Sequence, residues 1–152
     1  VPFSEDGDDL VSPPVPPTTQ QPRPPRVGIV FASNQVPGFH NVVAGLFDYF
    51  SQQGHCEVLG YLGGFEGLIK GRVVNIDKSM VDQYRNLGGQ DMLCQFDEHS
   101  DLGFKDHLKA VVATVSKHQL DGLVLVGNLQ SQCDAAFITE AFSAEHLSTR
   151  VI

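Results

Sequence analysis

The residues with the clearest potential for chemistry form a glycine-led turn near the C-terminal end of the sequence. Residues 120–126 read as a buried strand, residues 127–131 (Gly-Asn-Leu-Gln-Ser) follow, and a helix is expected from about residue 131 to 145. Such a turn binds phosphate in α/β proteins, because free backbone N–H groups and the helix dipole point toward it. Phosphoryl transfer also requires carboxylates there to hold magnesium. Leu129 and Gln130 supply none, so the turn predicts a phosphate-handling fold that has lost its catalytic chemistry.

Several other polar side chains are interpreted as structural. His40 is expected to cap a predicted helix in its neutral form, because a catalytic base would need a partner carboxylate in reach. Asp48 is expected to be a solvated surface charge, and Asp121 to order the turn before a buried strand. For Arg85, a phosphate contact and a structural salt bridge are equally open.

The remaining candidates for metal or thiol chemistry are weak. The acidic cluster Asp97, Glu98 and Asp101 lacks EF-hand spacing and a further ligand, so it is interpreted as a solvated loop. Cys133 is expected at a helix N-terminus, where the pKa of a thiol can fall, but a buried, inert thiol is the preferred interpretation. No metal ligand and no catalytic residue is therefore assigned in this sequence.

Short apolar runs alternate with stretches of helical spacing along residues 26–152, which predicts a parallel sheet with right-handed crossovers. Ligands of such folds bind at the C-terminal ends of the strands. The predicted strands are residues 27–32, 57–62, 73–74, 91–94, 123–126 and 149–152. The predicted helices begin near residues 41, 79, 104 and 131, and residues 65–71 are predicted to be a turn region.

Composition limits the classes of partner. The chain has 152 residues with a net charge of −8, which argues against a nucleic-acid face or a basic membrane patch. No apolar run approaches the ~20 residues of a membrane span, and no signal peptide is visible. The three cysteines fit neither a disulfide framework nor a zinc knuckle, which predicts a reducing, cytoplasmic location.

Residues 1–26 contain eight of the nine prolines and are predicted to form neither a helix nor a central strand. They are interpreted as a linker, with an extended arm on a neighbouring surface as the alternative. Residues 27–152 are predicted to be the folded part. The chain begins with Val1 and stops at Ile152 in a predicted strand, so it is interpreted as a fragment of a longer polypeptide.

Four ordered segments of the sequence resemble the pyrophosphate-dependent type of 6-phosphofructokinase, the long form. They include Pro-Gly-Phe-His-Asn at 37–41, Gly-Tyr-Leu-Gly-Gly at 60–64, Asn-Leu-Gly-Gly-Gln-Asp at 86–91, and the strand and turn of residues 120–131. The resemblance implies an α/β fold with a Rossmann-like parallel sheet and flanking helices, here an incomplete phosphofructokinase domain. It also implies a phosphate donor and fructose 6-phosphate at the strand ends, with Mg²⁺ assisting the transfer.

The departures from the family pattern lie at the phosphate-binding turns. Two glycines of the first turn are replaced by Ser33 and Asn34, whose Cβ atoms crowd a phosphate, although Asn tolerates positive φ. Gly-Gly-Asp-Asp-Ser of the second turn has become residues 127–131, so the magnesium aspartate is Leu129, and Gln130 removes a charge that favours pyrophosphate. The family's catalytic aspartate motif would follow Ile152. The degenerate phosphate-binding residues are thus Ser33, Asn34, Arg85, Gly127, Asn128, Leu129, Gln130 and Ser131.

The resemblance therefore predicts a non-catalytic, regulatory copy of the α type, with Mg²⁺ a cofactor of the family but not of this segment. Its expected partners are the remainder of the parent enzyme, a catalytic copy or subunit, and a phosphorylated effector. Two alternatives stay open. One is a divergent but active donor-binding part of a pyrophosphate- or ATP-dependent enzyme, and the other is a nucleotide- or sugar-phosphate-binding module.

Overall fold

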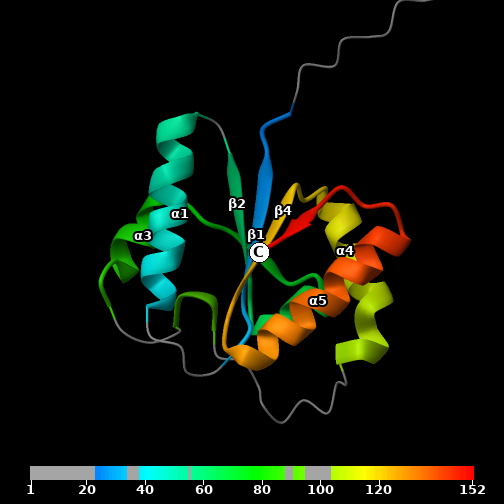
Figure 1. Ribbon diagram of the computed structural model, residues 1–152. Helices are drawn as coiled ribbons and strands as arrows, with labels where there is room; N and C mark the ends of the chain where they lie inside the picture. The colour runs from blue at the N-terminus through cyan, green and yellow to red at the C-terminus, as the bar shows by residue number, and fades with distance from the viewer. Residues whose placement is uncertain (1–22, 34–37, 55, 88–90, 95–103) are drawn as a thin grey trace, which may run out of the picture.

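The computed structural model of this protein describes residues 23–33, 38–54, 56–87, 91–94 and 104–152. Most of the proline-rich segment, Asn34 and the acidic cluster of residues 97–101 lie outside these ranges. Five strands form one sheet in the order β3-β2-β1-β4-β5 (Figure 1). The strands are β1 (Arg26–Phe31), β2 (Glu57–Tyr61), β3 (Val73–Asn75), β4 (Gly122–Val126) and β5 (Arg150–Val151).

The sheet is parallel except at one edge. β1 pairs in parallel with β2 and β4, and β4 pairs in parallel with β5, as the sequence predicts. β3 instead runs antiparallel to β2, with Val73 opposite Tyr61. The chain between these two strands makes only the short helix α2 (Gly64–Lys70), and it does not cross back to the other end of the sheet. The sheet is therefore mixed rather than wholly parallel.

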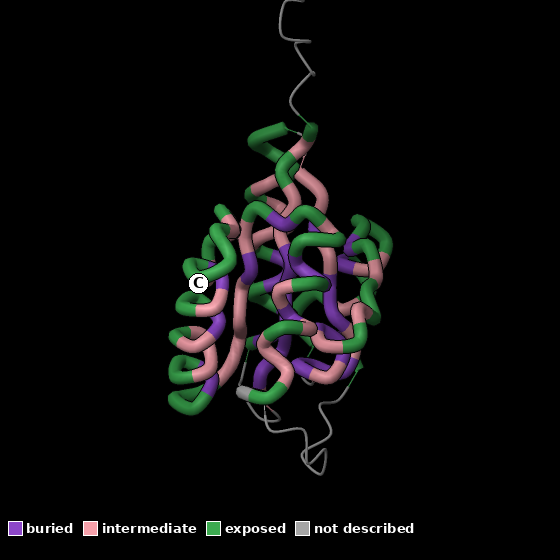
Figure 2. Tube along the Cα trace, turned by 90° about the vertical axis from the view of Figure 1, so that its right-hand side faces the viewer, coloured by how far each residue is buried: buried purple, intermediate pink, exposed green. Residues whose placement is uncertain are grey.

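Helices cover both faces of the sheet (Figure 1). α1 and α3 lie on one face, and α2, α4 and α5 lie on the other. Successive residues of β1 contribute to opposite layers: Ile29 and Phe31 pack in the core with α1 and α3, whereas Val30 packs in the core with α2, α4 and α5. Figure 2 shows buried backbone between exposed outer helix faces. The helices are α1 (Phe39–Gln53), α3 (Lys78–Tyr84), α4 (Leu108–His118) and α5 (Leu129–Ala144).

Two local predictions are wrong. Residues 65–71, predicted as a turn region, contain the helix α2, which ends at Gly71 in the left-handed conformation that glycine favours. The weak strand predicted at 91–94 is the 3-10 helix η1 (Asp91–Leu93), whose Met92 and Leu93 are buried against the α1 face. A second 3-10 helix, η2 (Phe104–His107), precedes α4. Within the described residues, no helix is long and apolar enough to cross a membrane.

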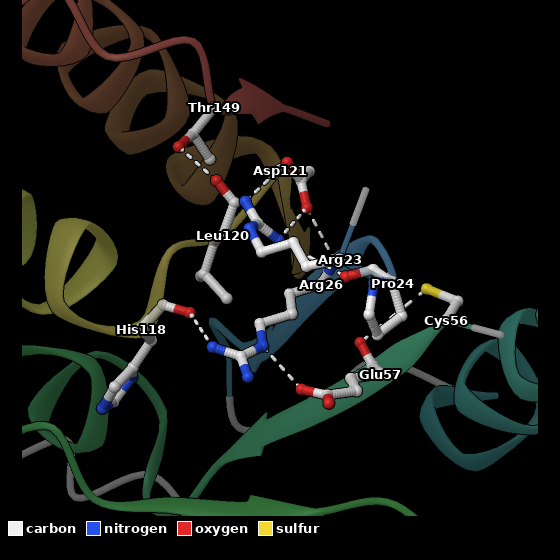
Figure 3. A network of polar contacts seen from close by, with 9 residues as sticks. All are labelled: Arg23, Pro24, Arg26, Cys56, Glu57, His118, Leu120, Asp121 and Thr149. Carbon is white, nitrogen blue, oxygen red and sulfur yellow. Dashed lines mark hydrogen bonds and ion pairs between the residues drawn. The ribbon is translucent and has the colours of Figure 1, made fainter. Parts of the chain in front are cut away.

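Polar contacts clamp the chain where it enters the sheet (Figure 3). Asp121 accepts hydrogen bonds from the Arg23 guanidinium at 2.8 and 3.0 Å and from the backbone N–H of Arg26 at 2.8 Å. The Arg26 side chain in turn contacts Glu57 and the carbonyl of His118. The Asp121 carboxylate thus holds the start of β1, and its role in the turn before β4 stays a prediction.

The contacts of Asp121 make the free energy of unfolding depend on pH. The hydrogen bond from Arg23 holds the pKa of Asp121 below its usual 3.8, so the unfolded chain takes up this proton first as pH falls. The stabilisation that the ionised Asp121 gives to the folded state is fully present above pH ~4 and is lost as the pH falls below that value. Asp121→Asn should therefore lower the free energy of unfolding at pH 7 by roughly 1 kcal/mol and should weaken its decline between pH 5 and 3. Urea unfolding at pH 7, 5 and 3 measures the free energy of unfolding of both proteins. Glu140→Gln, at an exposed position, is the control.

Candidate functional site

The turn between β4 and α5 is closed by its own side chains. Asn128 is the N-cap of α5, and its Oδ1 accepts from the backbone N–H groups of Gln130 at 2.9 Å and Ser131 at 3.3 Å. The buried Ser131 hydroxyl donates back to the carbonyl of Asn128 at 2.6 Å. These N–H groups are the ones that a phosphate would use at a helix N-terminus. The neutral side-chain amide of Asn128 therefore occupies the position in which a phosphate would accept these hydrogen bonds.

The same asparagine joins the two predicted phosphate turns. Its Nδ2 donates to Ser33 Oγ at 3.2 Å, and the N–H of Ala32 donates to the carbonyl of Val126 at 2.8 Å. The carboxyl ends of β1 and β4 are thus linked, so the structure brings Ser33 to the turn of residues 127–131 as the sequence predicts. A cavity of about 200 Å³ lies beside this turn, lined by Leu125, Gly127, Asn128, Ser131, Gln132, Ala135 and Ile152.

Gly127 is required by close packing rather than by ligand approach. A Cβ atom at Gly127 would lie 2.1 Å from Ser131 Oγ and 3.2 Å from Ala32 Cβ. The missing side chain of Gly127 therefore allows the first turn of α5 to pack closely, rather than leaving room for a phosphate. This helix begins at Leu129, two residues earlier than expected, because Asn128 caps it.

The turn does not fit a magnesium ion. Leu129 is 77% exposed and has no ligand atom, and the amide oxygen of Asn128 is engaged by two N–H groups. Mg²⁺ is held in proteins by carboxylate oxygens together with substrate phosphates, and residues 127–131 contain no carboxylate. Among the described residues, no group of three or more His, Cys, Asp or Glu side chains could hold a metal ion.

Arg85 forms a salt bridge on the other side of the sheet. Its guanidinium makes a two-pronged contact with Asp48 of α1, at 2.7 and 2.9 Å, and lies 3.7 Å from Asp82. The hydrogen bond between them raises the pKa of Arg85 and lowers that of Asp48. Asp48 is thus a partly exposed surface charge, as the sequence predicts, and it is paired with Arg85. Arg85 follows α3, whereas the turn precedes α5 on the opposite face, so these candidate residues are not brought together (Figure 1).

Two further predictions are corrected in part. His40 is buried and packs its ring against Tyr84, and its Nδ1 lies 3.2 Å from the carbonyl of Leu87. The N-cap of α1 is Gly38, with no side-chain cap, so His40 is structural but does not cap the helix. Cys133 is exposed, so the predicted burial of its thiol is wrong.

The residue that sequence reasoning undervalued is Asn128, which it treated only as part of a lost phosphate turn. The available signal was an asparagine directly before a helix, a preferred N-cap whose side chain bonds to N–H groups two and three residues later. Its second contact, to Ser33, joins residues 95 positions apart and had no local signal.

Comparison with known proteins decides the family. The phosphofructokinase family profile matches residues 26–149, which is most of the chain. The chain belongs to this family. It is 37% identical over 130 residues to the beta subunit of pyrophosphate–fructose 6-phosphate 1-phosphotransferase from Solanum tuberosum. It is also 37% identical over 128 residues to the alpha 1 subunit from Arabidopsis thaliana, and 39% identical over 136 residues to the Treponema pallidum enzyme of that name.

These phosphofructokinase relatives are much longer than the chain. The alignments cover 84% of this chain with the two plant subunits and 89% with the Treponema enzyme, but only 20–23% of the relatives. Pyrophosphate-dependent phosphofructokinase from Marinobacter aquaeolei shares the fold with a TM-score of 0.67 at 10% identity, over 84% of this chain and 32% of its own. Saccharomyces cerevisiae phosphofructokinase shares it with a TM-score of 0.64 at 19% identity, over 78% and 16%. The predicted resemblance and the α/β fold are confirmed.

Proposed function

We propose that this phosphofructokinase-family chain belongs to a larger protein of fructose 6-phosphate metabolism, in which it is a non-catalytic, structural or regulatory copy. The relatives named for pyrophosphate–fructose 6-phosphate phosphotransfer support the substrate class. The observation that supports a non-catalytic role is the closed turn, in which Asn128 caps α5. Leu129 occupies the position to which the family resemblance assigns a metal-binding aspartate.

The physical argument concerns the charge of the transferred phosphoryl group. Its transfer depends on cations and oriented N–H groups that stabilise this charge. At this turn a ligand would have to displace the Asn128 cap, which stabilises a helix by roughly 1 kcal/mol, before it could reach the N–H groups. It would then find no metal-bearing side chain. Donor binding at residues 127–131 is therefore disfavoured for pyrophosphate and for ATP.

The remainder of the parent polypeptide is the proposed partner, since the chain spans about a fifth of its curated relatives. Other copies or subunits in that protein would hold the Mg²⁺ and perform the transfer. The cytoplasm is the proposed location, because the three cysteines are free thiols and a reducing compartment maintains them. A phosphorylated effector, if one binds, would need a site other than the capped turn.

We expect Mg²⁺ and pyrophosphate, added together, to leave the Tm of the chain unchanged, because the turn offers no carboxylate and Asn128 engages the N–H groups of Gln130 and Ser131. The triple variant Asn128→Gly, Leu129→Asp, Gln130→Asp should acquire a Mg²⁺-dependent increase in Tm. Differential scanning calorimetry and titration calorimetry measure both effects. A coupled assay with fructose 6-phosphate should detect no bisphosphate product from the unmodified chain.

The matched control is the double variant Cys133→Asp, Ala136→Asp, which adds the same two charges at exposed positions further along α5. It should show no Mg²⁺-dependent increase in Tm. Tight binding of Mg²⁺ with pyrophosphate by the unmodified chain, abolished in a Gln130→Ala variant, would contradict the proposal of a non-catalytic turn.

A further inference from the structure

An aromatic groove lies at the end of the molecule opposite the capped turn. It has a volume of about 380 Å³ and is formed where the C-terminal part of α1 meets the beginnings of β1 and β2 (Figure 1). Tyr49 is 57% exposed, and its ring meets that of Phe50 edge to face with centroids 5.6 Å apart. The lining residues are Pro25, Tyr49, Phe50, Gln53, Gly54 and Cys56.

The proline-rich segment enters the fold at this groove. Pro25 is one of its walls, and the carbonyl of Pro25 accepts from the N–H of Glu57 at 2.8 Å. Two residues earlier, Arg23 is held by Asp121 (Figure 3). The residues that precede Arg23 are therefore tethered close to the exposed Tyr49 ring, and this tether raises their effective concentration at the groove.

The sequence before this anchor has the composition that such a groove recognises. Residues 1–22 contain six prolines, four of them in Pro-Pro-Val-Pro-Pro at residues 13–17. A segment of this kind favours the polyproline II helix, which loses little entropy on binding and docks on aromatic-lined grooves. Residues 18–22 can span roughly 15 Å as an extended connection, enough for residues 13–17 to fold back onto α1.

We propose that residues 13–17 dock in this groove of their own chain, with proline rings against Tyr49 and Phe50. The proline-rich segment is then an arm held on α1 rather than a free linker. Docking would cover the exposed aromatic surface of α1 and would fix the direction from which the preceding polypeptide reaches this domain. The proposal is independent of whether the capped turn is catalytic.

Cys56 provides a built-in probe, because it lines the groove and is partly buried. In a background with Cys94→Ser and Cys133→Ser, the rate of Cys56 labelling by a thiol reagent at fixed pH reports how often the groove is open. Substituting Pro13, Pro14, Pro16 and Pro17 by Ser should raise this rate roughly fivefold or more without altering the folded core. Tyr49→Ser should raise it similarly, whereas Val42→Ser, on the same helix outside the groove, should not.

Equal labelling rates in the parent and the proline-substituted chain would overturn the proposal. Protection that weakens on dilution would also overturn it, because it would place the arm of a second copy, or a second copy itself, in the groove. Protection that is independent of protein concentration and is lost in both the proline and Tyr49 variants supports docking within one chain. Circular dichroism and Tm values matched to the parent confirm that each variant is folded.

Discussion

Replacing Gly67 by alanine should destabilise the fold by about 3 kcal/mol, although alanine is the better helix former. Gly67 lies in α2, where a Cβ atom would be 2.1 Å from the carbonyl oxygen of Leu62 and 2.8 Å from its carbonyl carbon. These are backbone atoms, and the N–H of Leu62 is bonded to the carbonyl of Arg72 at 3.0 Å. The contact cannot be relieved by a side-chain rotation, so the loop that carries α2 must move away from the sheet.

The matched control for Gly67→Ala is Gly45→Ala. Gly45 also lies within a helix, α1, but a Cβ atom there would meet nothing within 4 Å. This substitution should stabilise the chain by roughly 0.5–1 kcal/mol through helix propensity. The midpoint of urea unfolding should therefore fall for Gly67→Ala and rise for Gly45→Ala, although both variants add one methyl group. Similar midpoints for both variants would contradict the packing of α2 against Leu62.

Gly127→Ala should destabilise the chain by about 2–4 kcal/mol and should open the capped turn. The added methyl group would overlap Ser131 Oγ at 2.1 Å and Ser131 Cβ at 2.7 Å. Ser131 is buried in the first turn of α5 and is bonded to Asn128, so α5 must shift relative to β4. This shift of α5 should also break the hydrogen bonds of Asn128 to the helix N–H groups and to Ser33.

A second substitution distinguishes this clash from a general loss of packing. Ser131→Gly removes the two atoms nearest to the new methyl group and leaves only Ala32 Cβ at 3.2 Å, so the double variant Gly127→Ala, Ser131→Gly should regain much of the lost stability. The two effects should be strongly non-additive, as expected for residues in contact. Gly122→Ala, at the start of the strand β4 that Gly127 follows, is the control, since the nearest neighbour atom of the added methyl group would be 3.7 Å away. An additive double variant would contradict the geometry of the turn.

Local patterns were sufficient to predict the central elements. The apolar runs of β1 and β4 and the helical spacing of α1 and α4 appear close to their predicted positions, because each pattern matches the burial of one element. The glycines of α2 suggest a turn, whereas the structure shows a helix in which Gly67 packs closely against Leu62. The apolar Met92 and Leu93 suggest a strand at η1, but an apolar pair indicates burial without specifying the backbone conformation.

Residue types in the sequence alone determined which chemistry the turn lacks. Leucine and glutamine at 129 and 130 cannot supply a carboxylate in any fold. Only the tertiary structure decided what the neighbouring side chains do instead. Asn128 reaches Ser33 across 95 residues, and Arg85 reaches Asp48 across 37, because sheet pairing and helix packing bring together side chains with no local relation. Composition thus limits the available ligands, whereas strand pairing and helix packing determine which polar groups are already engaged.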